Sequence, residues 1–407
     1  MTDNSKLYWV WLQSALGVRA KAAKIFTAFT CPQELYEAGA FEWRISGAFT
    51  PRQINRLENT SLDIAREIIE TCQKNKWGIV TPACEDYPVL LKDIDDYPLA
   101  LYTHGDLSCL KNKLNLAIVG TRHASAYGTE VAARLAASLT AAGALIVSGG
   151  ALGIDSAAHR GAMYEKGSTV AVLGCGLASD YLATNKALRN QIAQNGALVT
   201  EYPPATPALG SNFPIRNRLI SGMSLGTVVI EAGERSGSLI TANFALEQGR
   251  TVFAVAGDII NSSFTGANKL IRDGAKPVFS ALDILEEYEY SHSHIIDLSA
   301  VKPLGGEGTV PNPASAKISQ NQHEKRPVSK KEKAAKAKTV PPAKRDLPPE
   351  IGELETSVYR AVDRQPTHID DIIRASGREP AQVLVALTQL ELLGFIGLTD
   401  GKRYVLI

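Results

Sequence analysis

The amino-acid sequence predicts an α/β protein built on a doubly wound parallel β-sheet, with a small helical domain before it and a winged helix after it. Two features of the 407-residue chain carry this prediction. Between residues 115 and 280, six short β-branched runs alternate with helical stretches, a pattern that favours parallel strands covered by helices on both faces. Beyond a lysine- and proline-rich segment, the chain ends in three helical stretches and a hairpin.

The first part of the chain, residues 1–75, is expected to form the small helical domain. Its stretch ALGVRAKAAKIFTAF places a glycine turn before an apolar-periodic helix. This pattern resembles the second half of a helix-hairpin-helix, in which the turn brings backbone amides to a phosphate. A plain helical domain of the SAM-like kind fits the pattern equally well, so both interpretations stay open.

Residues 76–290 are expected to form the sheet domain. The six runs are NLAIVG, ALIVSGG, TVAVLGCG, ALVTEY, GTVVIEA and TVFAVAG. Apolar and polar residues do not alternate in them, which predicts strands that are buried on both faces. The helical stretches between them, several of which end in glycine, supply the crossover connections. The preceding stretch, from KWGIV to LYTHGDL, is expected to add edge strands.

The residues that follow the strands form the candidate binding site, because ligands of such sheets bind at the carboxyl ends of the strands. Arginine, glycine and serine gather there, where a dinucleotide site would have a glycine-rich loop. Arginine guanidinium groups and helix N-termini both bind phosphate groups. Three arginine-bearing loops at one edge therefore indicate a ligand with several successive phosphates. One aromatic ring among them could stack on a base. The candidate residues are Gly120, Thr121, Arg122, Ser148, Gly149, Gly150, Lys186, Phe213, Arg216, Asn217, Arg218, Arg235, Ser236, Gly237 and Ser238.

Residues 291–349 are expected to be a disordered basic linker. Between Lys302 and Asp346 the sequence has eleven Lys and Arg residues against four Asp and Glu, and no aromatic residue. Such a composition cannot bury enough apolar surface to offset the entropy of ordering the chain. The linker is interpreted as a solvated spacer, with a tether that adds nonspecific affinity for nucleic acid as the alternative.

Residues 350–407 are expected to form the winged helix, with Asp400 and Gly401 at the turn of its hairpin. The helix from Pro380 to Leu393, in the recognition position, has no Lys or Arg, whereas a helix that reads DNA normally offers basic or amide groups. This favours a module for protein interaction or dimerisation. The alternative, that the winged helix binds DNA, is supported by Lys402 and Arg403 of the wing.

Five long motifs carry a resemblance to a known family: VGTRHASAYG, SGGALGIDSAAHRGA, FPIRNRLISG, EAGERSGSLITANFALEQGRTVFAVAG and TGANKLIRDGA. In this order they resemble the DNA-processing protein A family (DprA/Smf), over about residues 80–280. The resemblance implies an extended Rossmann-like domain whose basic pocket binds single-stranded DNA without catalysis. It further implies a homodimer that protects incoming DNA in natural transformation and loads the RecA recombinase onto it, with single-stranded DNA-binding protein as a further partner.

The sequence departs from the family pattern at two positions where a lysine is common. The stretch YLATN has Ala183 where the family often has lysine, and Gly210 lies where a second lysine often precedes the aromatic residue. Lys186, one turn into the following helix, is the candidate that compensates.

Two other classes of protein are weighed against this one. The first is an enzyme of the lysine-decarboxylase-like phosphoribohydrolase type, which also has a Ser-Gly-Gly turn; here Glu231 lacks the Pro-Gly-Gly loop of those enzymes. The second is a winged-helix transcription regulator, which the uncharged recognition helix disfavours. No paired carboxylates, nucleophile–base set or metal cluster stands out in the sequence, so we expect no catalytic residues, metal or cofactor.

The sequence composition indicates the cellular compartment of the protein. No apolar run approaches the roughly 20 residues of a membrane helix, and no signal peptide is visible at the N-terminus. The five cysteines are widely spaced and form no CxxC pair. We therefore expect a cytoplasmic protein with reduced thiols and no membrane partner.

Overall fold

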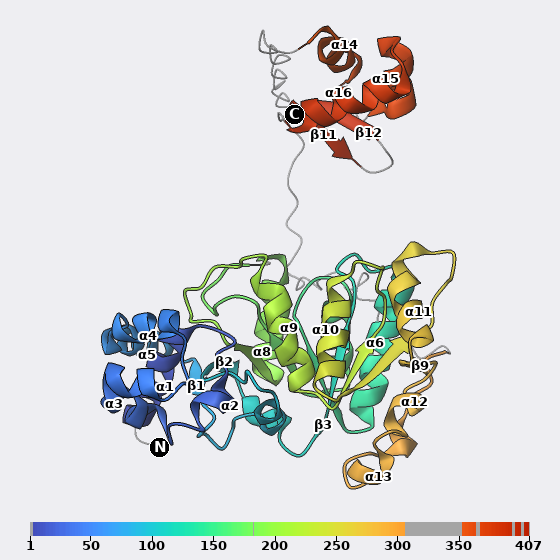
Figure 1. The fold of residues 1–407 in the computed structure, drawn as a ribbon. Helices are drawn as coiled ribbons and strands as arrows, with labels where there is room; N and C mark the ends of the chain where they lie inside the picture. Colours follow the sequence, from blue (N-terminus) through green and yellow to red (C-terminus); the bar gives the residue numbers. More distant parts are fainter. Residues whose placement is uncertain are drawn as a thin grey trace, which may run out of the picture. The chain divides into compact units, whose positions relative to one another are not determined.

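The computed structural model describes residues 3–181, 183–305, 352–363, 367–392, 395–399 and 403–406. The chain divides into two compact units, Met1–Gln320 and Asn321–Ile407 (Figure 1). No helix within the described ranges combines the length and the apolar character needed to cross a membrane.

The strands described in the first unit form one nine-stranded sheet in the order β1-β2-β6-β5-β4-β3-β7-β8-β9. The six predicted strands are confirmed as β3 (Leu114–Val119), β4 (Ala144–Ser148), β5 (Thr169–Val172), β6 (Ala197–Thr200), β7 (Gly226–Val229) and β8 (Thr251–Val255). All six run parallel, and β9 (Lys276–Val278) adds a further parallel strand. The predicted edge strands are β1 (Gly78–Val80) and β2 (Leu101–Gly105), and β2 pairs antiparallel with β6.

Helices cover both faces of the sheet, which explains why the strands lack polar alternation. The apolar residues of β3 divide between the faces: Leu116 and Ile118 lie in one core, and Ala117 and Val119 in the other. The first core is covered by α6 (Ala126–Ala141), α7 (Ile154–Tyr164) and α12 (Leu282–Leu285). The second is covered by α9 (Asn212–Gly222), α10 (Gly237–Glu247) and α11 (Thr265–Arg272).

The predicted N-terminal helical part is present and shares a core with the sheet. Its helices are α1 (Asp3–Leu16), α2 (Ala22–Ile25), α3 (Pro32–Ile45), α4 (Pro51–Glu58) and α5 (Leu62–Lys74). Trp11 and Leu35 lie in the same hydrophobic cluster as Tyr102 of β2 and Leu198 of β6. This cluster also contains Leu188 of α8 (Lys186–Asn195), which lies beside β2 in Figure 1. The helical part therefore packs as an extension of the sheet.

Residues 291–305, which the sequence assigns to the disordered linker, are ordered against the sheet domain. They begin within α13 (Glu289–His292), and the Lys302 N–H donates to Ser138 Oγ at 2.9 Å. Arg134 Nη1 donates to the Leu304 carbonyl at 2.7 Å. Because these residues add apolar contacts and backbone hydrogen bonds to the core beneath α6, that part of the prediction is wrong. The rest of the predicted linker lies outside the described residues.

The second unit contains the predicted winged helix. Its helices are α14 (Glu353–Ala361), α15 (Ile369–Ser376) and α16 (Pro380–Leu392). Its described strands form a three-stranded antiparallel sheet of β10 (Thr367–His368), β12 (Arg403–Leu406) and β11 (Ile396–Thr399). The predicted turn at Asp400 and Gly401 and the wing residue Lys402 lie outside the described residues.

Candidate functional site

A pocket of about 630 Å³ lies at the carboxyl ends of β3 and β7, where the strand order reverses. These strands are neighbours, but the chain builds β4, β5 and β6 on one side of β3 before it crosses to β7 on the other. The loops diverge at such a switch point and leave a crevice for ligands. The predicted site residues that line this pocket are Gly120, Thr121, Arg122, Phe213, Arg216, Asn217, Ser236, Gly237 and Ser238.

The loop after β3 presents Arg122 as an exposed cation. Its guanidinium carbon lies 5.0 Å from the centre of the Phe213 ring, within cation–π distance. The Thr121 N–H holds the loop by donating to the Glu231 carbonyl at 2.8 Å. Gly153 allows the start of α7 to approach from the other side, because its φ is +74° and a Cβ there would lie 2.4 Å from the Thr121 carbonyl oxygen. The backbone beneath Arg122 is thus fixed while its guanidinium faces solvent.

Helix α9 places an aromatic ring, a guanidinium and an amide on one side, because Phe213, Arg216 and Asn217 are three and four residues apart. The centre of the Phe213 ring lies 4.8 Å from that of Tyr181. A Cβ at Gly174 would lie 2.8 Å from the Phe213 ring, so the ring rests on the backbone that follows β5. Phe213, Tyr181 and Arg122 therefore form a cluster of flat groups at the pocket.

Arg216 forms the floor of the pocket rather than its open face. The residue is 4 % exposed, and its Nη1 donates to the carbonyls of Gly149, at 2.8 Å, and Val172. Asp155 is buried beside it; burial raises the pKa of Asp155, and the charge of Arg216 opposes that rise. Burial also lowers the pKa of Arg216. Arg216 is thus buried and held by backbone carbonyls, whereas Arg122 is the exposed arginine among the described residues that line the pocket.

The N-terminus of α10 forms a further part of the pocket lining. Ser236 caps the helix and accepts a hydrogen bond from the Ser238 N–H at 3.4 Å, and the two hydroxyls lie 2.8 Å apart. Asn217 Nδ2 donates to the Gly237 carbonyl at 3.2 Å and ties this turn to α9. Hydroxyl groups at a helix N-terminus, together with the helix dipole, favour an anion.

The other predicted residues lie outside the lining of this pocket: Ser148, Gly149, Gly150, Lys186, Arg218 and Arg235. Ser148 is buried, and its Oγ donates to the Ile118 carbonyl at 2.6 Å. Gly149 leaves room for Arg216, since a Cβ there would lie 2.9 Å from Arg216 Nη2. Gly150 has a φ of +65° and turns the chain behind the pocket. Lys186 and Arg235 are exposed nearby.

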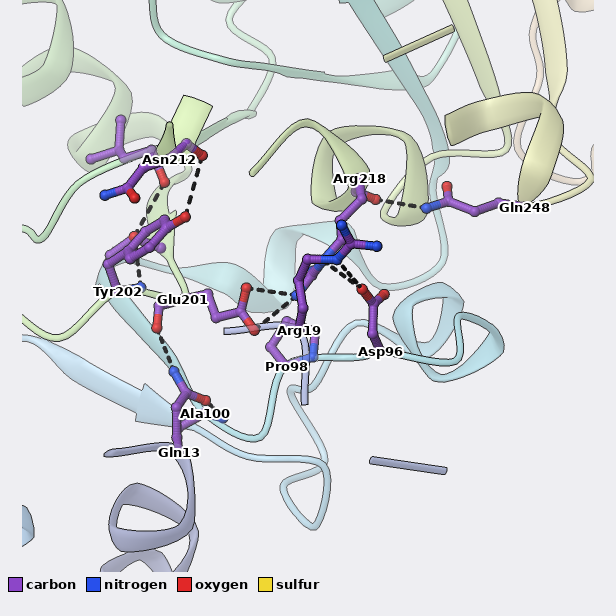
Figure 2. A network of polar contacts seen from close by, with 12 residues as sticks. Gln13, Arg19, Asp96, Pro98, Ala100, Glu201, Tyr202, Asn212, Arg218 and Gln248 are labelled. Atoms are coloured by element: carbon purple, nitrogen blue, oxygen red, sulfur yellow. Dashed lines mark hydrogen bonds and ion pairs between the residues drawn. The ribbon is translucent and has the colours of Figure 1, made fainter. Parts of the chain in front are cut away.

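Arg218 has a different role from the predicted one. Its side chain is 1 % exposed, and its Nη2 donates to both carboxylate oxygens of Glu201, at 2.9 and 2.8 Å (Figure 2). Its Nε lies 3.2 Å from Asp96, which also pairs with Arg19 of the N-terminal part at 3.0 Å. The predicted contact of Arg218 with a ligand phosphate does not fit this placement, because its guanidinium pairs with Glu201 and Asp96 in a buried network and does not line the pocket.

Sequence reasoning missed four polar residues of the pocket lining: His123, Asp155, Tyr181 and Thr241. Asp155 had a signal, since an acid in the first turn of a helix after a Ser-Gly-Gly turn lies at the strand ends. Tyr181 had no comparable signal, because its place beside Phe213 depends on the path of the loop after β5.

Glu231 is buried and does not line the pocket. Its carboxylate is buried and accepts hydrogen bonds from Ser125 N, at 3.0 Å, and Ser125 Oγ, at 2.8 Å. A Cβ at Gly128 would overlap Glu231 Oε2, so α6 packs directly on the carboxylate. Glu231 therefore anchors the N-terminus of α6 below the pocket.

The fold and the pocket define a doubly wound α/β protein with an arginine and aromatic ligand site at its switch point and a winged helix as a second unit. Residues 78–289 match the DNA recombination-mediator protein A family, and residues 341–402 match the DprA winged helix domain. The chain belongs to the DNA recombination-mediator protein A (DprA/Smf) family.

Individual relatives agree with this assignment. Protein Smf of Synechocystis is 30 % identical over 99 % of both chains. DNA processing protein DprA of Bacillus subtilis is 43 % identical over 50 % of this chain and 68 % of the relative. The X-ray structure of DNA processing protein A from Streptococcus pneumoniae superposes with a TM-score of 0.61 at 33 % identity, covering 70 % of this chain and 97 % of that one.

Proposed function

We propose that the pocket at the ends of β3 and β7 binds single-stranded DNA without catalysing a reaction on it. The observation that carries the proposal is the exposed Arg122 guanidinium against the Phe213 ring, with Tyr181 beside them. Flat aromatic and guanidinium groups stack on unpaired bases, and a guanidinium also binds the phosphate backbone. Membership in a family of recombination mediators, whose relatives carry the name DNA processing protein, supports DNA as the ligand.

The pocket favours an unpaired strand over a duplex. In a duplex the flat faces of the bases are stacked on one another, so Phe213 and Tyr181 could not reach them. Backbone contacts carry no base information, and stacking accepts every base, so we expect little sequence preference.

The polar groups of the pocket support binding rather than catalysis. Among the described residues that line it, Asp155 is the one carboxylate, and it is buried with its Oδ2 accepting from Ala151 N at 3.3 Å. A general acid or base must reach the reacting group. Glu231, which a phosphoribohydrolase would require in the pocket, is held by Ser125 below it.

We further propose that the protein acts in natural transformation as a homodimer that protects incoming strands and passes them to the RecA recombinase, with single-stranded DNA-binding protein as a further partner. The family description, a recombination mediator, supports this role. In this proposal residues 76–290 hold the strand. Residues 1–75 extend the sheet, and residues 350–407 contact protein through α16, whose Val385 is exposed.

The test compares the affinity of the full chain for oligothymidylate, a duplex of the same length and a mononucleotide, each at two salt concentrations. We expect the single strand to bind far more tightly than the other two ligands, with an affinity that falls as salt rises. Tight binding of the mononucleotide, followed by release of its base, would refute the proposal and support the phosphoribohydrolase.

A further inference from the structure

A second pocket, of about 230 Å³, adjoins the first, and Tyr181 lines both. It lies between α8 and the antiparallel edge of the sheet, with Trp77 and His104 on the strand side. Lys186 and Arg189 line it from α8 and face the same side, because they are three residues apart. The function proposed above uses Tyr181 but no other residue that lines this pocket.

The residues of the second pocket repeat the chemistry of the first. Trp77 is half-buried and lines the pocket, and Lys186 is an exposed cation. Asp180 is the acidic residue among the lining residues. An aromatic ring beside lysine and arginine is the combination that binds unpaired nucleotides.

Tyr181 is held in place at the junction of the two pockets. Arg189 Nη1 donates to the carbonyl of Tyr181 at 3.0 Å and to that of Ser179 at 3.3 Å, which ties the loop after β5 to α8. On its other side the Tyr181 ring contacts Phe213. The aromatic groups Phe213, Tyr181 and Trp77 therefore extend from one pocket to the next, with Arg122 at one end and Lys186 toward the other.

We propose that a DNA strand bound in the first pocket continues past Tyr181 into the second, where a base stacks on Trp77 and a phosphate pairs with Lys186. This inference rests on the proposed function and extends its site across α8. It also assigns a role to Lys186, which lies outside the first pocket.

The first experiment locates the strand directly. Oligothymidylates with one 5-iododeoxyuridine at successive positions are bound to the full chain and irradiated, and the cross-linked peptides are identified by mass spectrometry. We expect one set of positions to cross-link to Phe213 or Tyr181, and positions further along the strand to cross-link to Trp77. Cross-links to Phe213 or Tyr181 from some position, with none to Trp77 from any, would overturn the inference and leave the proposed function standing.

The second experiment measures affinity against strand length in Lys186→Ala and Trp77→Ala, with Trp77→Phe to control for packing. Long oligothymidylates should bind about 5- to 100-fold more weakly to Trp77→Ala, and Trp77→Phe should recover most of the loss. In Lys186→Ala the slope of log affinity against log salt should fall by about 0.7 for long strands only. The shortest strands, which fill the first pocket alone, should bind as they do to the unaltered protein.

The matched control for Lys186→Ala is Lys113→Ala, because Lys113 is an exposed lysine just before β3, at the amino end of this central strand, and the first pocket lies at its carboxyl end. It should leave affinity and salt slope unchanged for every length. If Lys186→Ala behaves like Lys113→Ala while Arg122→Ala still weakens all lengths, the second pocket is not part of the DNA path. If Arg122→Ala has no effect on any length, the proposed function fails as well.

Discussion

Replacing Arg218 with methionine should destabilise the protein by about 3 to 5 kcal/mol, the usual cost of removing one partner from a buried ion pair. The structure supports this magnitude, since Arg218 is 1 % and Glu201 3 % exposed, and both Glu201 oxygens accept from the guanidinium. Methionine fills much of the volume of the aliphatic part of arginine. The decrease in the free energy of unfolding therefore reflects the unpaired charge of Glu201 more than a cavity. The affinity of the folded molecules for single-stranded DNA should stay unchanged.

The destabilisation should depend on pH, and the ionisation of Glu201 determines whether it grows or shrinks as pH rises. Burial raises the pKa of Glu201, and Arg218 opposes that rise, so the variant raises the pKa further. A carboxyl with a higher pKa in the folded than in the unfolded state binds its proton more tightly when folded, so stability falls as pH rises above the unfolded value. The stability difference between the two proteins should therefore be larger at neutral pH than in mild acid.

Urea denaturation of both proteins at several pH values measures the free energy of unfolding, and anisotropy of labelled oligothymidylate measures affinity. Arg66→Met is the matched control, because Arg66 forms an exposed ion pair with Asp63, and its loss should have little effect on stability. If Arg218→Met keeps its stability but lowers DNA affinity and flattens the salt dependence, Arg218 contacts a phosphate, and our interpretation of the buried network is wrong.

Four further variants probe the site and its support. Arg122→Ala should weaken binding to every sequence and lower the salt slope by about 0.7, whereas Phe213→Ala should cost about 1 to 3 kcal/mol of affinity without changing the slope; equal slopes for both would contradict the assigned roles. Gly153→Ala should lower both the melting temperature and DNA affinity, because the position has a φ of +74° and its Cβ would meet the Thr121 carbonyl; an unchanged melting temperature would count against this. A chain that ends after residue 305 should retain single-strand binding, since it keeps the contacts of Lys302 with Ser138; a folded truncate without binding would place the site downstream.

The sheet could be predicted from sequence because its signal is local and repeated. Each of the six central strands is a β-branched run followed by a helix, and right-handed crossovers leave few ways to arrange them. The edge pairing could not be derived in the same way. Whether β2 pairs with β6 or with another strand depends on how the N-terminal helices pack, which no local pattern records.

The candidate site was predicted as a set of loops, and the structure separates its members. Arg216 and Arg218 are two residues apart on α9, and residues at that spacing do not share a face of a helix. Helical periodicity alone could therefore have excluded one of them from the pocket. Which arginine meets the ligand and which is buried depends on tertiary contacts, in particular on Glu201 and Asp96, which lie far apart in sequence.

The pairing of β2 with β6 has a consequence for the order of folding during translation. Gly105 of β2 faces Ala197 of β6, so β2 leaves the ribosome long before the strand that completes its hydrogen bonds. Until then one edge of β2 and the apolar side of the N-terminal helices have no partner, a state that invites association with other nascent chains. Because the helices, β2 and β6 share one hydrophobic cluster, closure of this edge completes the N-terminal part and the sheet together. Slow or interrupted synthesis between residues 105 and 197 should therefore increase aggregation more than a pause after β6.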